Sequence, residues 1–180
     1  TGRPPRWMPE VAEATGHAGV GICGNGAFIY DMADEAVLEL FGMSGELAAD
    51  AVDRVREVLP NSAFAVESLP GFSYEPTYRP RWDVHEPTTT GPIHGLLTDD
   101  IAKLLVRDEV LPGDVMLELA APALSGVVEV THSDVNDSLL ELSALGVEHL
   151  EEVGHAAGET QSRALRGARA CLGRLVEPVH

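Results

Sequence analysis

The sequence predicts an α/β fold with antiparallel strand pairs in its middle part. The first observation is a stripe of apolar residues at helical spacing from Ser44 or Gly45 to Leu59, which predicts a helix. The second is a set of short apolar or alternating segments bounded by turn residues, which is typical of strands. The third is that the turn sequences "MADE" and "SDVND" each separate two such segments, so each pair is expected to form a hairpin.

The N-terminal part is expected to contain one helix followed by strands. Pro4 and Pro5 suit a first helical turn, because the N–H that proline lacks has no partner there. Apolar residues at helical spacing follow, and Gly16 ends the helix. "GVGIC" (19–23) predicts a short buried strand and "GNGA" (24–27) a tight loop. "FIYD" and "AVLEL" then form the hairpin around "MADE".

The second half of the chain is expected to alternate strands with one further helix. Pro60 ends the helix that begins near Ser44, and a helix with a possible start at Asp114 lies within "LPGDVMLELAAPAL". A long loop rich in Pro, Gly and Thr is expected between residues 69 and 95, and a less regular helical segment between 149 and 175. The expected strands are "AFAVES" (63–68), "AKLLVR" (102–107), "GVVEVTH" (126–132) and "SLLELSA" (138–144).

Charge and composition exclude several classes of function. The chain has 180 residues and a net charge of −17, which argues against binding to nucleic acid or to an anionic membrane surface. Cys23 and Cys171 are too few for a disulfide framework or a zinc site, which indicates a reduced, cytoplasmic compartment. No apolar run is long enough to span a bilayer. Periodicity alone also leaves open a non-catalytic, ligand-binding α+β domain.

Two motifs point to a family. The segment "TGRP" (1–4) is followed by the predicted helix, a short strand and "GNGAFIYD" (24–31). This order resembles the Cof-type subfamily of haloacid-dehalogenase-like (HAD) phosphatases, in which one strand ends in Ala-Thr-Gly-Arg-Pro and a later one in Asn-Gly-Ala. Farther on, "KLLV", "GVVEVTHS" and "LLELSALGV" also occur in the order that the family uses. The resemblance extends from Thr1 to about Val147.

The resemblance implies a division into three parts. Residues 1–27 would be part of the Rossmann-like HAD core, and 28–143 an α/β cap domain with an antiparallel sheet. Residues 144–180 would be a divergent C-terminal helical tail where the core resumes. The whole enzyme would be a Mg²⁺-dependent phosphatase of small phosphorylated metabolites, such as sugar phosphates or a cofactor phosphate. Oligomeric state does not follow from the sequence.

The resemblance also implies a phosphate site. A phosphomonoester is doubly charged, and its cleavage needs hydrogen-bond donors around the transferring group. Thr1 would donate its hydroxyl, Gly2 its backbone N–H and Arg3 its guanidinium. Asn25, beside Gly26 on the glycine-flanked loop, would orient either the substrate or the neighbouring loop. Each of these residues alone is ordinarily a surface or terminal residue, and it is their combined spacing that favours a site.

Several parts of the family pattern are missing from this sequence. The nucleophile of the family is an aspartate in an Asp-x-Asp-Gly-Thr loop, which is expected upstream of Thr1. The family's Gly-Asp-x-x-Asn-Asp metal loop is absent, so no metal ligand is assigned, and "SDVND" is interpreted as a turn. His149 stands where the family has a lysine, and it is interpreted as an ordinary surface histidine. The tail carries four arginines, at 163, 166, 169 and 174, and we hypothesise that it is out of frame, divergent or truncated.

Three interpretations of function remain open at this point. The first is a HAD phosphohydrolase that is present as a fragment and is inactive alone. The second is a non-catalytic phospho-ligand-binding or regulatory module that kept the cap. The third is a fragment without a role of its own. An aromatic and basic cluster in the long loop consists of Tyr74, Tyr78, Arg79, Arg81 and Trp82. Its aromatic residues are interpreted as closing a small core of the cap, with contact of the cluster to a phosphorylated ligand as the alternative.

Overall fold

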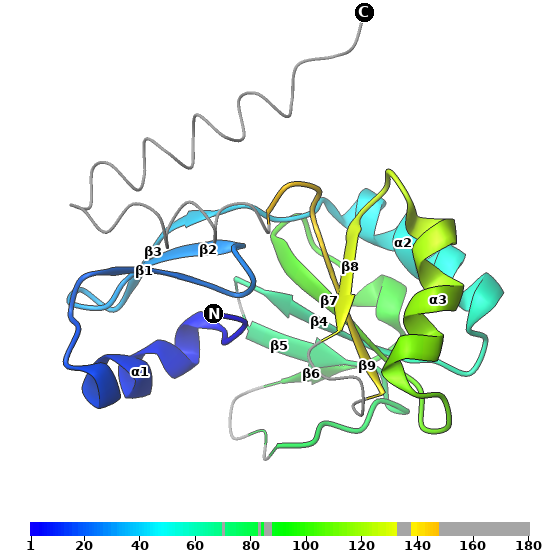
Figure 1. The fold of residues 1–180 in the computed structure, drawn as a ribbon, viewed down its shortest axis with the longest axis horizontal. Helices are drawn as coiled ribbons and strands as arrows, with labels where there is room; N and C mark the ends of the chain where they lie inside the picture. Colours follow the sequence, from blue (N-terminus) through cyan, green and yellow to red (C-terminus); the bar gives the residue numbers. More distant parts are fainter. Residues whose placement is uncertain (70, 83, 85–87, 133–137, 148–180) are drawn as a thin grey trace, which may run out of the picture. The chain divides into compact units, whose positions relative to one another are not determined.

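The computed structural model describes residues 1–69, 71–82, 84, 88–132 and 138–147 (Figure 1). The chain forms two compact units. Among the described residues, unit 1 contains Thr1–Phe41, Gly146 and Val147, and unit 2 contains those within Gly42–Leu145. The chain therefore passes between the units after Phe41 and after Leu145, whereas the sequence placed domain boundaries after 27 and 143. The assignment of these parts to a core, a cap and a tail stays a prediction.

Unit 1 contains the predicted helix, the predicted strand β1 and the predicted hairpin of β2 and β3, and β1 also pairs with β2, so that the three strands form one antiparallel sheet in the order β1-β2-β3. The helix ends at Gly16, which adopts the left-handed conformation (φ 67°) that suits glycine at a helix C-terminus. In the β2–β3 turn, the Asp31 carboxylate accepts hydrogen bonds from the N–H groups of Ala33 and Asp34. The described elements of unit 1 are η1 (Pro5–Trp7), α1 (Met8–Thr15), β1 (Val20–Cys23), β2 (Phe28–Asp31) and β3 (Ala36–Leu40).

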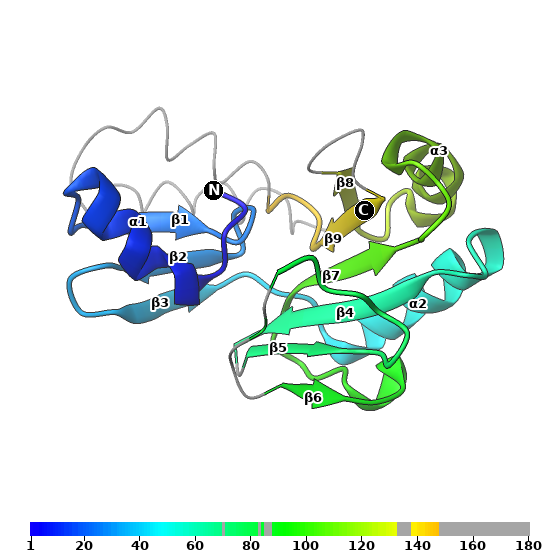
Figure 2. The same ribbon diagram turned by 90° about the horizontal axis from the view of Figure 1, so that it is seen from below.

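Unit 2 consists of a six-stranded sheet with two helices on one face (Figures 1 and 2). The strand order is β6-β5-β4-β7-β9-β8, and all neighbouring strands are antiparallel except β5 and β6. The described elements are α2 (Gly45–Val58), β4 (Ala63–Ser68), β5 (Gly71–Tyr74), β6 (Thr89–Thr90), η2 (Ile93–Gly95), β7 (Ile101–Arg107), α3 (Gly113–Leu124), β8 (Glu129–His132) and β9 (Leu139–Ser143).

The main core of unit 2 lies between the two helices and the sheet. Side chains alternate between the faces of a strand, so every second residue of β4, β7 and β9 points to the helices. These residues are Phe64, Val66, Leu104, Val106, Leu140 and Leu142. The helix α2 begins where predicted, because the Ser44 side chain accepts the N–H of Leu47 and so satisfies a group that lacks a helical partner.

The structure differs from the prediction in the long loop. Part of the segment between 69 and 95 forms β5, β6 and the short helix η2. Gly71 (φ 134°) closes a tight turn after Ser68, and Phe72 and Tyr74 then pair with β4. The strand β5 was not predicted, because the prolines and glycines around it indicate a loop. The turn predicted at 133–137 and the helical segment predicted at 149–175 lie outside the described residues.

Glu75 joins three parts of unit 2. Its carboxylate accepts the buried N–H of Phe64 at 3.0 Å and forms an ion pair with Arg56 of α2. Its own N–H donates to the Phe64 carbonyl at 2.9 Å. The Glu75 side chain is 10% exposed, so water replaces these contacts poorly.

Replacing Glu75 by alanine is therefore expected to lower the free energy of unfolding by about 1–3 kcal/mol, since it leaves a buried N–H without an acceptor. Glu75→Gln keeps an acceptor oxygen and is expected to cost less. Urea unfolding followed by circular dichroism measures both, with the exposed Glu57→Ala as control. An equal effect of Glu75→Ala and Glu57→Ala would contradict the assignment.

Candidate functional site

The segment Thr1–Arg3 lies against the loop that follows β1. The N–H of Gly24 donates to the Arg3 carbonyl at 2.8 Å, and the N–H of Asn25 donates to the Thr1 carbonyl at 3.2 Å. The amino group of Thr1 donates to the Ile22 carbonyl at 3.3 Å. The predicted residues Thr1, Arg3 and Asn25 are thus neighbours in unit 1, although they are distant in sequence.

The β1–β2 loop owes its shape to three consecutive residues with positive φ. These are Gly24 (63°), Asn25 (57°) and Gly26 (92°). Glycine adopts such angles without steric cost, and asparagine tolerates them better than most residues. The Ala27 N–H donates to the Gly24 carbonyl at 3.2 Å and closes the turn. The sequence "GNGA" therefore folds locally into the tight loop that was predicted.

Gly26 lies against a third segment, at Val147, beside the β1–β2 loop and the segment Thr1–Arg3. We call this region of unit 1 the corner. A Cβ atom on residue 26 would collide with the backbone carbonyl of Val147. The loop therefore contacts both the segment Thr1–Arg3 and Val147. Gly26 was predicted to bind phosphate or substrate. The contact that the structure describes for Gly26 is with the backbone of Val147.

The exposed part of this corner carries hydrogen-bond donors. Thr1, Gly2 and Arg3 are all exposed, and the N–H of Arg3 donates weakly to the Thr1 hydroxyl oxygen at 3.4 Å. The neighbouring β2 is buried throughout. There, burial raises the pKa of Tyr30, followed in effect by the charges of Glu35 and Cys23, so its hydroxyl stays protonated at neutral pH. Thr1, Gly2 and Arg3 therefore form an exposed surface of this corner, and their predicted binding of phosphate stays a prediction.

The aromatic residues of unit 2 form a small core, which confirms that interpretation. Phe72 and Tyr78 are buried on the face of the sheet opposite α2 and α3, with Tyr74 and Trp82 packed beside them. Ring centroids of neighbouring pairs lie 5.5–6.2 Å apart. The guanidinium over the Tyr78 ring, at 5.7 Å, belongs to Arg107, which was not in the predicted cluster.

Buried charged side chains on the face of the sheet opposite α2 and α3 were not predicted from the sequence. Lys103 on β7 forms an ion pair with Glu141 on β9 at 3.4 Å, and their side chains are only 5% and 13% exposed. Glu67 on β4 is opposite Lys103 in the register and is also buried. The signal was the alternation within "AKLLVR" and "LLELS", which puts these polar residues on the face opposite the helix-covered core.

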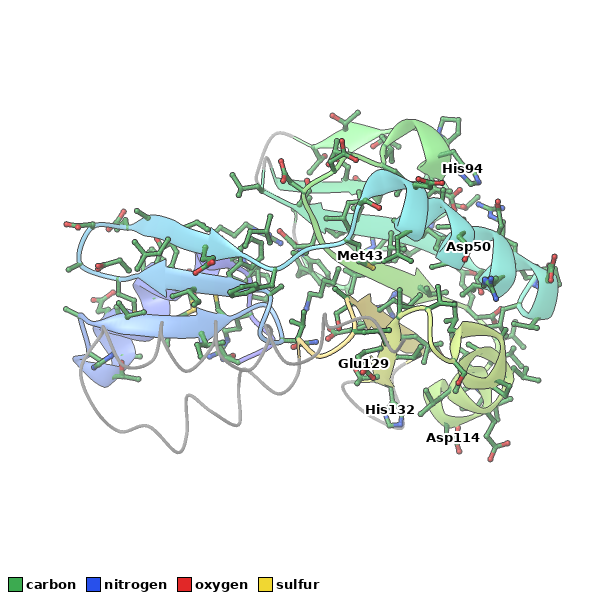
Figure 3. The ribbon with its side chains drawn as sticks, turned by 90° about the horizontal axis from the view of Figure 1, so that it is seen from above. Met43, Asp50, His94, Asp114, Glu129 and His132 are labelled. Atoms are coloured by element: carbon green, nitrogen blue, oxygen red, sulfur yellow. The ribbon has the colours of Figure 1, made fainter. Side chains whose placement is uncertain are left out.

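The described residues do not supply a metal site. Among them, no three His, Cys, Asp or Glu side chains gather as a group that could hold a metal ion. Asp50 on α2, Asp114 on α3 and Glu129 on β8 come from different elements (Figure 3). His149 and the "SDVND" segment lie outside the described residues. In the part of the chain that the structure describes, no helix has the length and apolarity needed to cross a membrane.

Comparison with known proteins identifies the fold. No family model matches the sequence, and no curated protein matches it. Solved structures do, among them a haloacid dehalogenase-like hydrolase from Bacteroides thetaiotaomicron, with 15% identity and a TM-score of 0.62 over 86% of this chain and 60% of that one. A HAD-superfamily phosphatase from the same organism gives 18% identity and a TM-score of 0.60, over 87% of this chain and 56% of that one.

A subclass IIB sugar phosphatase of the superfamily gives 12% identity and a TM-score of 0.62, over 91% of this chain and 63% of that one. This chain thus spans about three fifths of the length of the first of these structures. The described residues have the α/β fold of haloacid dehalogenase-like hydrolases, as the resemblance implied.

The close approach at Gly26 leads to a stability prediction. Gly26→Ala is expected to lower the free energy of unfolding by more than about 2 kcal/mol, because it adds a clash with Val147 to the strain of a positive φ. Gly16→Ala is the matched control in the same unit, since Gly16 also has a positive φ but open space around it. It is expected to cost about 1 kcal/mol. Urea unfolding that finds equal losses would refute the role of the Val147 contact.

Proposed function

We propose that this chain is part of a HAD-superfamily phosphohydrolase that acts on a small phosphorylated metabolite. The observation that carries the proposal is the corner where Thr1–Arg3 meets the Asn25 loop, within a fold that phosphatases share. One of the similar structures is a sugar phosphatase, and a sugar phosphate is one substrate class consistent with such a site. A cofactor phosphate is another.

The chemistry of the corner suits a phosphoryl group. Its oxygens need several donors that stay in place while charge develops on them. The Thr1 hydroxyl and the Gly2 backbone N–H would hold one side of the group, and the Arg3 guanidinium would neutralise charge on another. The residues of this chain would thereby bind and orient the phosphoryl group. No residue of this chain is assigned to the nucleophilic attack.

Mg²⁺ dependence is proposed for the whole enzyme only. The described residues do not form a group suited to the ion, so no step is assigned to it here. The 180-residue sequence also contains no Asp-x-Asp-Gly-Thr segment. The proposed compartment is the cytoplasm, because the chain has only two cysteines, and the net charge of −17 argues against a nucleic-acid or membrane partner.

The alternative is a non-catalytic module that binds a phosphorylated ligand. It is supported by the same corner, where the Asn25 loop binds the Thr1–Arg3 segment. Both proposals predict phosphate binding. They differ in whether a longer polypeptide carries the chemistry.

The 180-residue chain alone is expected not to hydrolyse p-nitrophenyl phosphate above background, with or without Mg²⁺, because it lacks a nucleophile loop. Release of p-nitrophenol followed by absorbance measures this. Mg²⁺-dependent turnover that follows the protein through purification would overturn the expectation.

The same chain is expected to bind inorganic phosphate, and Arg3→Gln is expected to weaken this binding about tenfold, since a charge-assisted hydrogen bond is lost. Phosphorus NMR titration measures the dissociation constant. Arg6→Gln is the control, because it removes the same charge from a guanidinium that lies over the Trp7 ring. If the two variants weaken phosphate binding equally, Arg3 acts only through its charge and not through a specific contact. If the chain does not bind phosphate, both proposals are wrong.

A further inference from the structure

The buried charged side chains of unit 2 lie beside an irregularity in the strand pairing. We call Glu67 of β4, Lys103 of β7 and Glu141 of β9 the charged cluster. A buried ion pair seldom stabilises a fold more than apolar side chains of similar size, so stability explains this cluster poorly. We infer that the charged cluster fixes the position of a β-bulge in β7 and thereby places Ile101 where it pairs with Met43. The inference does not depend on the proposed function.

The bulge lies directly beside the charged cluster. Glu67 lies opposite Lys103 in the register of β4 and β7, but the next residue of β4, Ser68, lies opposite Ile101. Ala102 therefore opposes no residue of β4, which is the arrangement of a β-bulge. The pairing is thus regular from Lys103 to the end of β7 and shifted by one residue on the other side of Ala102.

The bulge changes the face of the sheet to which β7 directs its side chains. In a regular strand, Ile101 and Lys103 would share a face, because side chains two residues apart point the same way. Ile101 is instead buried in the main core, together with Leu104 and Val106, on the face toward α2 and α3. The bulge thus allows an apolar residue to enter the main core from a strand whose alternation assigns it to the opposite face.

The shifted part of β7 receives the chain at the start of unit 2. The Met43 N–H donates to the Ile101 carbonyl at 2.7 Å, and the Ile101 N–H donates to the Met43 carbonyl at 3.3 Å. The Leu69 N–H donates to the Asp100 carbonyl at 3.3 Å and continues the shifted register. Met43 lies shortly before α2 and is buried in the main core (Figure 3). The position of the bulge therefore decides whether Ile101 meets Met43.

The charged cluster opposes a movement of the bulge along β7. If the bulge moved by one residue, Glu67 would lie opposite Ala102, and Lys103 would be the residue without an opposite partner on β4. A buried carboxylate would then lie opposite an alanine instead of a cation, which is costly. Glu141 holds the Lys103 ammonium from the strand on the other side of β7, at 3.4 Å. Register is strongly specified only where one arrangement satisfies the side chains better than its neighbours do.

The test removes all charges of the cluster from the 180-residue chain at once. The triple variant carries Lys103→Met, Glu67→Gln and Glu141→Gln, so that no single charge is left buried alone. Its free energy of unfolding, measured with urea, is expected to stay the same or to rise, because neutral side chains of similar size have no charge to desolvate. A loss of the lock on the bulge therefore becomes visible separately from a loss of stability.

The deciding measurement is amide hydrogen exchange, followed residue by residue by NMR. The N–H groups of Met43, Ile101 and Leu69 form the hydrogen bonds of the shifted register. In the triple variant these three amides are expected to exchange about tenfold faster, because the bulge opens locally without unfolding of the sheet. The amides of Leu104 and Val106, in the regular part of β7, are the internal reference and are expected not to exchange faster.

Two further variants complete the test. Asp50→Asn with Arg54→Gln neutralises an exposed ion pair on α2 of the same unit, and it is expected to leave the exchange of all five amides unchanged. Glu67→Gln alone keeps the Lys103–Glu141 pair, and it is expected to speed exchange in the shifted register by about threefold. This single variant decides the question if the triple variant does not fold.

Two results would overturn the inference. If the neutralised variants exchange as slowly as the unmodified chain in the shifted register, the apolar packing of Ile101 fixes the bulge without the charged cluster. If the reference amides speed up as much as those of the shifted register, the charges contribute to general stability and hold no particular position.

Discussion

A close approach that only glycine permits organises the candidate site. Gly26 lets the β1–β2 loop reach the carbonyl of Val147, and the same loop offers the N–H groups of Gly24 and Asn25 to the segment Thr1–Arg3. Three segments that are far apart in sequence meet there through backbone atoms. The side chains of the site therefore depend on a turn whose conformation is fixed by three consecutive positive φ angles.

Unit 2 follows a different principle, in which the alternation of its strands separates two environments. The face toward α2 and α3 is apolar and forms the main core. The opposite face divides into an aromatic part around Tyr78 and a charged part around Lys103 and Glu141. A buried ion pair seldom stabilises a fold more than apolar side chains of similar size would. The charged part is therefore poorly explained by stability, whereas the aromatic part is explained by packing.

Much of the fold could be predicted because its signals are local. The serine cap before α2, the alternation in β4 and the turn residues around β2 and β3 all act within a few residues. The strand β5 was missed because prolines and glycines surround it, although it pairs with the neighbouring strand β4 across a short turn. The contact between Gly26 and Val147 and the one between Asn25 and Gly2 could not be predicted, because each joins residues that are distant in sequence. The motifs indicated these residues as candidates, but the contacts that they make are long-range.

The role proposed for unit 1 separates the binding of a phosphoryl group from its cleavage. Donors that hold such a group need only fixed backbone geometry, which the Gly24–Gly26 loop provides from within this chain. Cleavage needs in addition a nucleophile whose position relative to those donors is fixed to a fraction of an ångström. The backbone hydrogen bonds between this loop and the Thr1–Arg3 segment lie inside unit 1. Phosphate binding, as proposed for these residues, would therefore be separable from catalysis.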